Sequence, residues 1–377
     1  MDLHEGGGRL EDRRGPAALS TTSLPPRPAR RGRTTTIPDR PDPAPTGTGT
    51  GGGWIVSPAY DLLFLANLGW LLLLVPGMAT SSDTAVDFWQ VYFLTLPHRW
   101  ITLFLVALDP DRRGGRGLRL GMIAVAFLIL VTGVWIGTEA FLCLGVIDYL
   151  WNSWHFAAQH GGVLRMYTRK VGGGSEWLER HGVRFFVVYA TLRTAGWTTG
   201  WLEADSGSFA YLRAIDLAVL TVPALLVGSV LVGFRHDRTG KALYLASLCA
   251  LYWGLILSLS FGWSGGVIVL ATASGLFHAV EYLGVVTHYA QRRRSTGNAG
   301  AFRSLAKHWL LYLGLYVALL GALGVWMERG GAGSRWFELW AGLNLWAAFV
   351  HYAYDGMIWK LRRPETARAL GVENGGA

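Results

Sequence analysis

Long apolar runs recur along this chain from Trp54 to about residue 360, and they constrain its fold more than any other feature. Each run has the length of an α-helix that crosses a bilayer core of roughly 30 Å. Lipid offers no hydrogen bonds, so each spanning segment must satisfy its own backbone as a helix. The sequence predicts an all-α, polytopic integral membrane helix bundle of about ten transmembrane helices. The predicted spans are residues 55–77, 88–108, 118–137, 140–163, 183–201, 211–234, 242–261, 266–290, 308–326 and 336–359.

The charges between these runs predict the orientation of the helices. With ten spans, alternate loops such as DPDRRGGRG, RHDRTGK and QRRRSTGNAGAFRSLAK are basic, whereas the opposite loops are acidic or nearly neutral. Positive loops stay on the cytoplasmic side, so we expect both termini to be cytoplasmic. The net charge of +9 follows from this topology and predicts no nucleic-acid partner. The expected location is a bacterial inner (plasma) membrane, crossed many times and surrounded by membrane lipids.

The composition predicts three regions. Residues 1–53 are rich in Pro, Arg, Gly and Thr and lack apolar periodicity, so we expect a disordered cytoplasmic tail. Residues 54–363 form the ten-helix transmembrane domain, and residues 364–377 form a short cytoplasmic C-terminal tail. The division between the third and fourth spans depends only on Gly137, Thr138 and Glu139.

Six of the ten histidines lie within predicted spans, and a seventh, His308, lies at the boundary between a loop and a span. Ionisable side chains in a membrane are costly and usually face a protein interior for a functional reason. The predicted orientation places most of the six in the cytoplasmic half of the bundle, which favours a shared metal site. The candidate ligands are His98, His155, His160, His278, His288 and His351.

Helical phase groups these histidines with other polar residues. At about 100° per residue, three of the spans each present a polar stripe, whereas His160 lies about 140° from His155. Gly161 and Gly162 would have to loosen the helix for His160 to join His155. The stripes contain Asp148, Asn152, His155 and Gln159; His278, Glu281 and His288; and Asn344, His351 and Asp355.

Imidazole and carboxylate ligands without thiolate suit iron, zinc, copper or manganese. We predict one or two metal ions in the bundle core, with Glu281 and Asp355 as catalytic carboxylates that bind or orient the metal. Amides and carboxylates often hold the second ring nitrogen of a metal-bound histidine. That supporting role is predicted for Asp148, Asn152, Gln159 and Asn344. Two further candidates, Arg99 and Arg193, are expected to form ion pairs, with Asp61 or Asp148, or to contact substrate.

The segments HFAAQH, FHAVEYLGVVTHY and HYAYDGMIWK resemble the membrane histidine-box non-haem iron enzymes, the fatty-acid desaturases and hydroxylases. WHFAAQH and LPHR also loosely resemble the Brp/Blh-type β-carotene dioxygenases. These resemblances imply iron, O₂, a reductase or other electron donor, and a lipid or isoprenoid substrate. The chain lacks the adjacent HH pairs of desaturases, which disfavours desaturation itself.

Three functions follow from these patterns. The first is an integral membrane metal-dependent oxidoreductase or oxygenase, with non-haem iron in the cytoplasmic half of the bundle. The second is a haem b electron-transfer protein, with His155 and His351 as axial ligands. The third is a proton-coupled transporter with the histidines and acids as its relay, although no internal repeat is visible.

Overall fold

The computed structural model describes residues 52–75, 91–198, 209–232, 234–294, 300–329 and 334–373. All of these lie within one compact unit, Thr48–Ala377. Every regular element in the described ranges is a helix, and none is a strand, so the all-α prediction is confirmed. The predicted disordered tail lies outside the described residues except for its last two, Gly52 and Gly53.

Five of the described helices or helix pairs are long and apolar enough to cross a membrane, as expected for a membrane protein. Two of them, α4 and α12, bury little of their surface, and side chains such as Leu319 are 71% exposed. Broad exposed apolar faces on long helices fit a lipid environment. The five are α4 (Gly117–Thr138), α7 (Phe209–Val219) with α8 (Thr221–Val232), α9 (Thr239–Ser260) with its preceding turn, α10 (Ser264–Arg293) and α12 (Trp309–Arg329).

Four further helices carry many of the polar residues singled out in the sequence. They are α2 (Leu96–Leu108), α5 (Leu142–Val171), α6 (Glu176–Thr198) and α13 (Arg335–Ile358). The break predicted at residues 137–139 is confirmed, because α4 ends at Thr138 and the next residue, Glu139, adopts the left-handed conformation (φ 52°). α5 runs eight residues beyond its predicted span, since Leu164, Met166 and Tyr167 pack into the core. His155 therefore lies at the middle of a helix and not near its end.

The first predicted span is not one regular helix, and here the prediction was wrong. It consists of α1 (Pro58–Tyr60), a π-helical turn η1 (Asp61–Leu65) and a 3₁₀ helix η2 (Leu68–Leu74), separated at Asn67 (φ 44°). The buried Asp61 carboxylate accepts hydrogen bonds from the backbone N–H groups of Ile55 and Val56. These side-chain contacts hold the chain in a compact turn where a straight helix was expected.

α2 also begins irregularly, after a π-helical turn η3 (Val91–Thr95). Pro97 has no N–H to donate to the preceding turn, so a distorted entry is expected at this position. The Tyr316 hydroxyl donates to the carbonyl of Pro97 at 2.6 Å. His98 therefore follows directly after a residue whose carbonyl is held by a hydrogen bond from α12.

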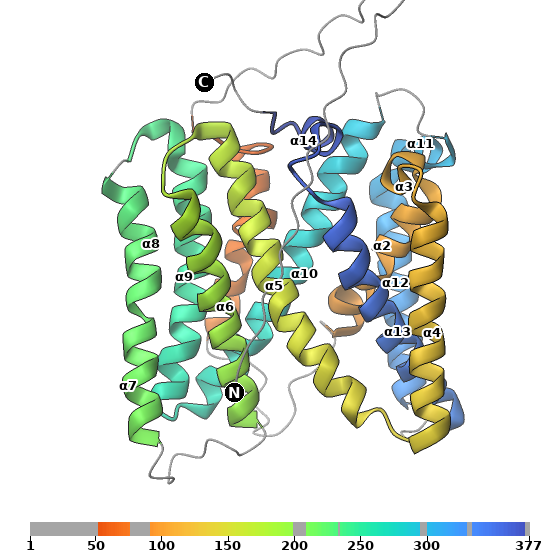
Figure 1. Cartoon of the computed structure of the whole chain (residues 1–377). Coiled ribbons are helices and arrows are strands. Elements are labelled where there is room, and N and C mark those ends of the chain that lie inside the picture. The colour runs from red at the N-terminus through yellow and green to blue at the C-terminus, as the bar shows by residue number, and fades with distance from the viewer. Residues whose placement is uncertain are drawn as a thin grey trace, which may run out of the picture. The chain divides into compact units, whose positions relative to one another are not determined.

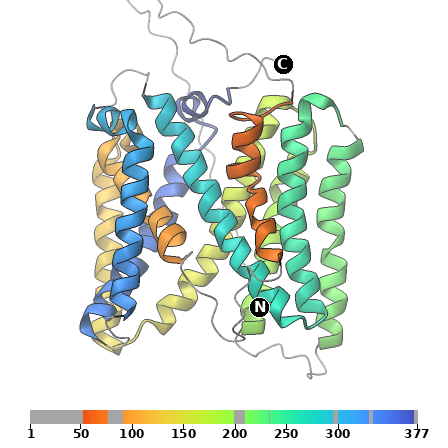
Figure 2. The ribbon, with the colours of Figure 1, turned by 180° about the vertical axis from the view of Figure 1, so that it is seen from behind.

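α5 and α10 lie between two groups of helices and contact each other (Figures 1 and 2). On one side are α6, α8 and α9, and on the other are α2, α4, α12 and α13. The predicted C-terminal tail contains α14 (Pro364–Leu370), which packs on α10 and buries Ala367 and Leu370. The remaining short helices are α3 (Pro110–Arg113), η4 (His236–Arg238) and α11 (Gly300–Lys307).

Candidate metal centre

Four histidines from four helices meet beside the contact between α5 and α10. They are His98 of α2, His155 of α5, His278 of α10 and His351 of α13, here called the four-histidine cluster. Their ring centroids form a closed circuit, with separations of 4.9 Å (98–278), 5.0 Å (278–155), 4.7 Å (155–351) and 5.0 Å (351–98). All four side chains are buried.

These separations match those expected of histidines around one metal ion. Metal–imidazole nitrogen distances of about 2.0–2.1 Å place adjacent ligand nitrogens roughly 3 Å apart and adjacent ring centroids roughly 4.5–5 Å apart. The Nε2 atoms of His155 and His351 lie 3.0 Å apart. One nitrogen of each of His98, His278 and His351 lies within 4.8 Å of the other two. The four rings therefore suit a single ion, or two ions that share His351.

Two members of the cluster lack a well-aligned hydrogen bond at their ring nitrogens. Neither nitrogen of His98, and neither of His278, has a hydrogen-bond partner of good geometry in the described part of the chain. Burying a polar group without a partner costs about 1–3 kcal/mol, and native proteins rarely do so. A bound metal would use one nitrogen on each ring, so the donor set fits a metal better than it fits packing alone.

Asp355 and Thr102 support His351. The Thr102 hydroxyl lies 2.7 Å from His351 Nδ1 and donates to Asp355 Oδ1 at 3.4 Å. A hydroxyl that donates to the carboxylate can accept from Nδ1–H, which leaves the Nε2 lone pair of His351 available for a metal. Asp355 Oδ2 lies 3.9 Å from His155 Nε2 and 3.7 Å from His351 Nε2. Asp355 is therefore placed either to bind a metal or to orient its ligands.

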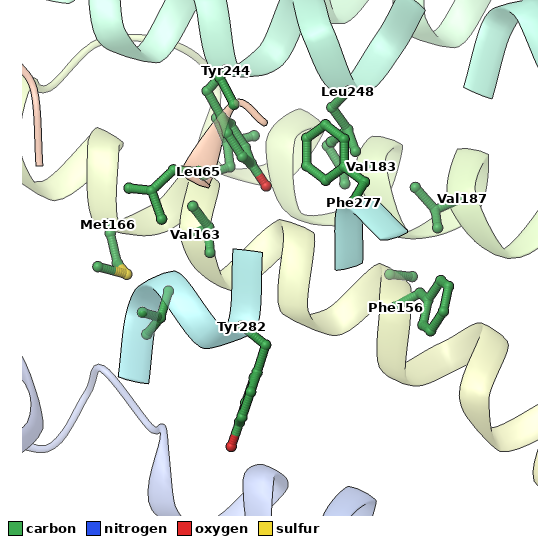
Figure 3. Close-up of a cluster of buried hydrophobic side chains, with 14 of the residues drawn as sticks. Leu65, Phe156, Val163, Met166, Val183, Val187, Tyr244, Leu248, Phe277 and Tyr282 are labelled. Atoms are coloured by element: carbon green, nitrogen blue, oxygen red, sulfur yellow. The ribbon is translucent and has the colours of Figure 1, made fainter. Parts of the chain in front are cut away.

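Tyr282 connects this carboxylate to α10. Its hydroxyl donates to Asp355 Oδ1 at 2.8 Å and accepts from Trp359 Nε1 at 3.2 Å. Figure 3 shows the Tyr282 ring extending from its helix away from the packed side chains of Tyr244 and Phe277. On the other side of the cluster, Phe156 stacks on the His278 ring at 3.9 Å. Aromatic side chains thus fix the rings and keep their surroundings apolar.

His160 and Glu281 form a separate buried pair. His160 Nδ1 lies 3.0 Å from Glu281 Oε2, and the carboxylate also accepts from Gln159 Nε2 at 2.7 Å and from the Tyr244 hydroxyl at 2.6 Å. α5 continues without a break through Gly161 and Gly162, so the helical phase keeps His160 on a different face from His155. The His160 ring centroid lies 6.1 Å from that of His278. The structure therefore places this pair beside the four-histidine cluster and not within it.

His288 and Asn344 lie apart from the cluster. His288 comes ten residues after His278 on α10, or about 15 Å along the helix axis. Its Nε2 lies 3.1 Å from the Leu370 carbonyl oxygen of α14. Asn344 accepts from Trp100 Nε1 at 2.9 Å and donates to the Trp340 carbonyl. The partners of both side chains therefore lie outside the four-histidine cluster. Four of the six candidate ligands remain adjacent to one another.

Asp148 and Asn152 reach the cluster indirectly. The Tyr352 hydroxyl lies 3.0 Å from a side-chain oxygen of each, and the Tyr352 ring lies 4.8 Å from that of His155. Asp148 also pairs with Arg99 at 3.8 Å, as the sequence predicted.

The second arginine pairs differently from the prediction. Arg193 Nε lies 3.3 Å from Asp216, whose carboxylate also accepts from Tyr189 and Ser260. The expected alternative, Asp61, accepts from the Tyr167 hydroxyl. The spacing of Arg193 and Asp216 in the sequence does not predict that they pair, so this ion pair could be identified only from the folded structure.

Sequence reasoning missed Thr102, Tyr282, Tyr352 and Phe156. Two of them carried a usable signal, since Thr102 is four residues after His98 and Tyr282 is four residues after His278. Side chains at this spacing share one face of a helix.

Comparisons with protein-family models, with curated proteins and with solved structures found no match to this chain.

Proposed function

We propose that this chain is an integral membrane metal-dependent oxidoreductase or oxygenase with non-haem iron at the four-histidine cluster. The observation that carries the proposal is the meeting of four buried imidazoles from four helices. Among the described residues, the ring nitrogens of His98 and His278 have no hydrogen-bond partner of good geometry. Neutral imidazoles with a nearby carboxylate suit iron, although zinc, copper and manganese share this preference. Bound iron would supply the activation of O₂.

His98, His155, His278 and His351 would hold the metal, and Asp355 would complete its ligands or orient them. His160, Glu281 and Gln159 would lie beside the metal ligands without binding the metal. Separations of 4.7–5.0 Å between neighbouring rings suit one ion. In the apolar surroundings given by Phe156 and the core side chains, water would be kept away from the reacting atoms.

A lipid or isoprenoid substrate and an external electron donor complete the proposal. Support for the substrate class comes from the five helices of membrane-spanning length, because a site inside such a bundle is most accessible to apolar molecules. We further propose ten membrane crossings, cytoplasmic termini and a bacterial inner membrane location. The alternation of basic and acidic loops supports that topology.

Haem b fits the same residues less well. Axial ligands lie on opposite sides of the haem iron, so their nitrogens are separated by about 4 Å. The Nε2 atoms of His155 and His351 are only 3.0 Å apart. His98 and His278 would also occupy the space that a flat macrocycle needs between its two ligands.

The test is the metal content of the full chain, purified in detergent under low oxygen. We expect one to two irons per chain by elemental analysis and no Soret absorption band. A Soret band would overturn the proposal and indicate a haem-binding protein instead. Folded protein with no metal, even after iron is added back, would overturn it and direct attention to proton-coupled transport.

A further inference from the structure

An apolar groove lies between α2, α11 and α12, apart from the four-histidine cluster. Its volume is about 220 Å³, and its walls include Ile101, Leu105, Phe302, Leu305, Trp309 and Leu313. Phe104 and Tyr312, which also line it, are 48% and 44% exposed, so the groove is open at the surface of the helices. Its lining is almost entirely hydrocarbon and aromatic ring.

The size and position of the groove favour a slender chain. Sites that enclose whole small molecules usually measure roughly 300–1,000 Å³, which is more than this groove provides. The α12 residues that line it run from Trp309 to Tyr316, a rise of about 10 Å along the helix. α12 is one of the helices able to cross a membrane, and the groove begins at its first residue. It therefore extends from one end of the helix toward the level of the lipid chains.

α11 supplies charge at that end of the groove. Phe302 and Ala306 are buried and Leu305 is half-buried, whereas the two charged residues of α11, Arg303 and Lys307, are exposed. The described α11 is thus amphipathic, with its apolar side on the groove and its basic side outward. Amphipathic helices with basic polar faces lie at membrane surfaces and attract anionic lipids.

We propose that this groove is a binding site for one anionic phospholipid of the membrane. One acyl chain lies along α12 between Leu105 and Leu313, and the phosphate headgroup lies against Arg303 and Lys307 of α11. Charge complementarity selects the headgroup, while the apolar walls hold the chain. The site uses none of the four histidines and is independent of the proposed metal chemistry.

The experiment measures lipid binding to the delipidated full chain in detergent by native mass spectrometry. The probes are palmitoyl-oleoyl phosphatidylglycerol and palmitoyl-oleoyl phosphatidylcholine, which have the same chains and different headgroup charge. A basic residue near the membrane surface contributes about a five-fold preference for anionic lipid. We expect the first phosphatidylglycerol to bind at least ten-fold more tightly than phosphatidylcholine, and Arg303→Gln with Lys307→Gln to remove most of that difference.

Two further variants complete the test. Leu305→Trp fills the groove and is expected to weaken the first binding event for both lipids. The matched control, Arg180→Gln with Arg362→Gln, removes two exposed arginines elsewhere and should change nothing. Equal binding of the two lipids by the unmodified chain would overturn the proposal, as would unchanged binding in Leu305→Trp or an equal loss in the control. Metal content, measured on the same samples, reports separately on the four-histidine cluster.

Discussion

The Nε2 atoms of His155 and His351 face each other at 3.0 Å, although 196 residues separate them in the chain. Two neutral imidazoles at this distance must either share one proton or direct both lone pairs at a common cation. Thr102, 2.7 Å from His351 Nδ1, favours the tautomer with a lone pair on His351 Nε2. The two arrangements predict different consequences when a ring is removed.

Replacing His278 tests the shared cation. His278→Ala should reduce bound metal to less than one fifth of the unmodified level, because it removes one of four ligands and leaves the coordination open. The measurement is elemental analysis of protein purified in parallel with His308→Ala, whose histidine is exposed and should leave the metal content unchanged. Equal metal content in the two variants would exclude His278 as a ligand.

Thr102→Val tests the support of His351. Valine keeps the shape of threonine and removes the hydroxyl, so the His351 tautomer and the Asp355 carboxylate both lose a partner. Loss of such an outer contact usually lowers metal affinity about 10–100-fold. Competition with a chelator measures that affinity. Thr194→Val is the matched control, since the Thr194 hydroxyl donates to the carbonyl of Ala190 in its own helix; the same loss in both variants would argue against a specific role for Thr102.

The two buried carboxylates should behave differently. Asp355 lies within 4 Å of two ligand nitrogens, whereas Glu281 contacts His160, Gln159 and Tyr244. Asp355→Asn should therefore lower the metal affinity at least ten-fold, with Glu281→Gln remaining within about three-fold of the unmodified chain. Chelator competition again provides the readout. A larger effect for Glu281→Gln than for Asp355→Asn would reassign the carboxylate of the site.

The helical bundle and most of its segments could be predicted because apolar runs and turn residues are local signals. The break at Glu139 is an example, since glycine and a charged residue mark it within three positions. The irregular first span could not be predicted in the same way. Its π and 3₁₀ turns depend on Asp61, whose hydrogen bonds with Ile55 and Tyr167 include a partner from a distant helix.

Helical phase predicted part of the site and failed at its limits. It separated His160 from His155 by angle, and the structure keeps them apart. It grouped His288 with His278 because both share a helix face with Glu281, which lies three residues after His278 and seven before His288. The ten residues between the two histidines nevertheless place them about 15 Å apart along the helix axis. Helical phase predicts the direction in which a side chain points but not its position along the helix axis. A contact between helices depends on both.

The Arg193–Asp216 pair provides a prediction about stability. Both side chains are buried, and removal of one partner of such a pair costs about 3–5 kcal/mol because the other charge is left uncompensated. Asp216→Ala should lower the free energy of unfolding in mixed detergent micelles by that amount. Arg193→Met combined with Asp216→Leu should lose less than Asp216→Ala alone, since no charge remains buried. The exposed Arg368–Glu373 pair is the control, and Glu373→Ala should change stability by less than about 1 kcal/mol. A loss in Asp216→Ala no greater than in Glu373→Ala would mean that water reaches Arg193 and compensates its charge.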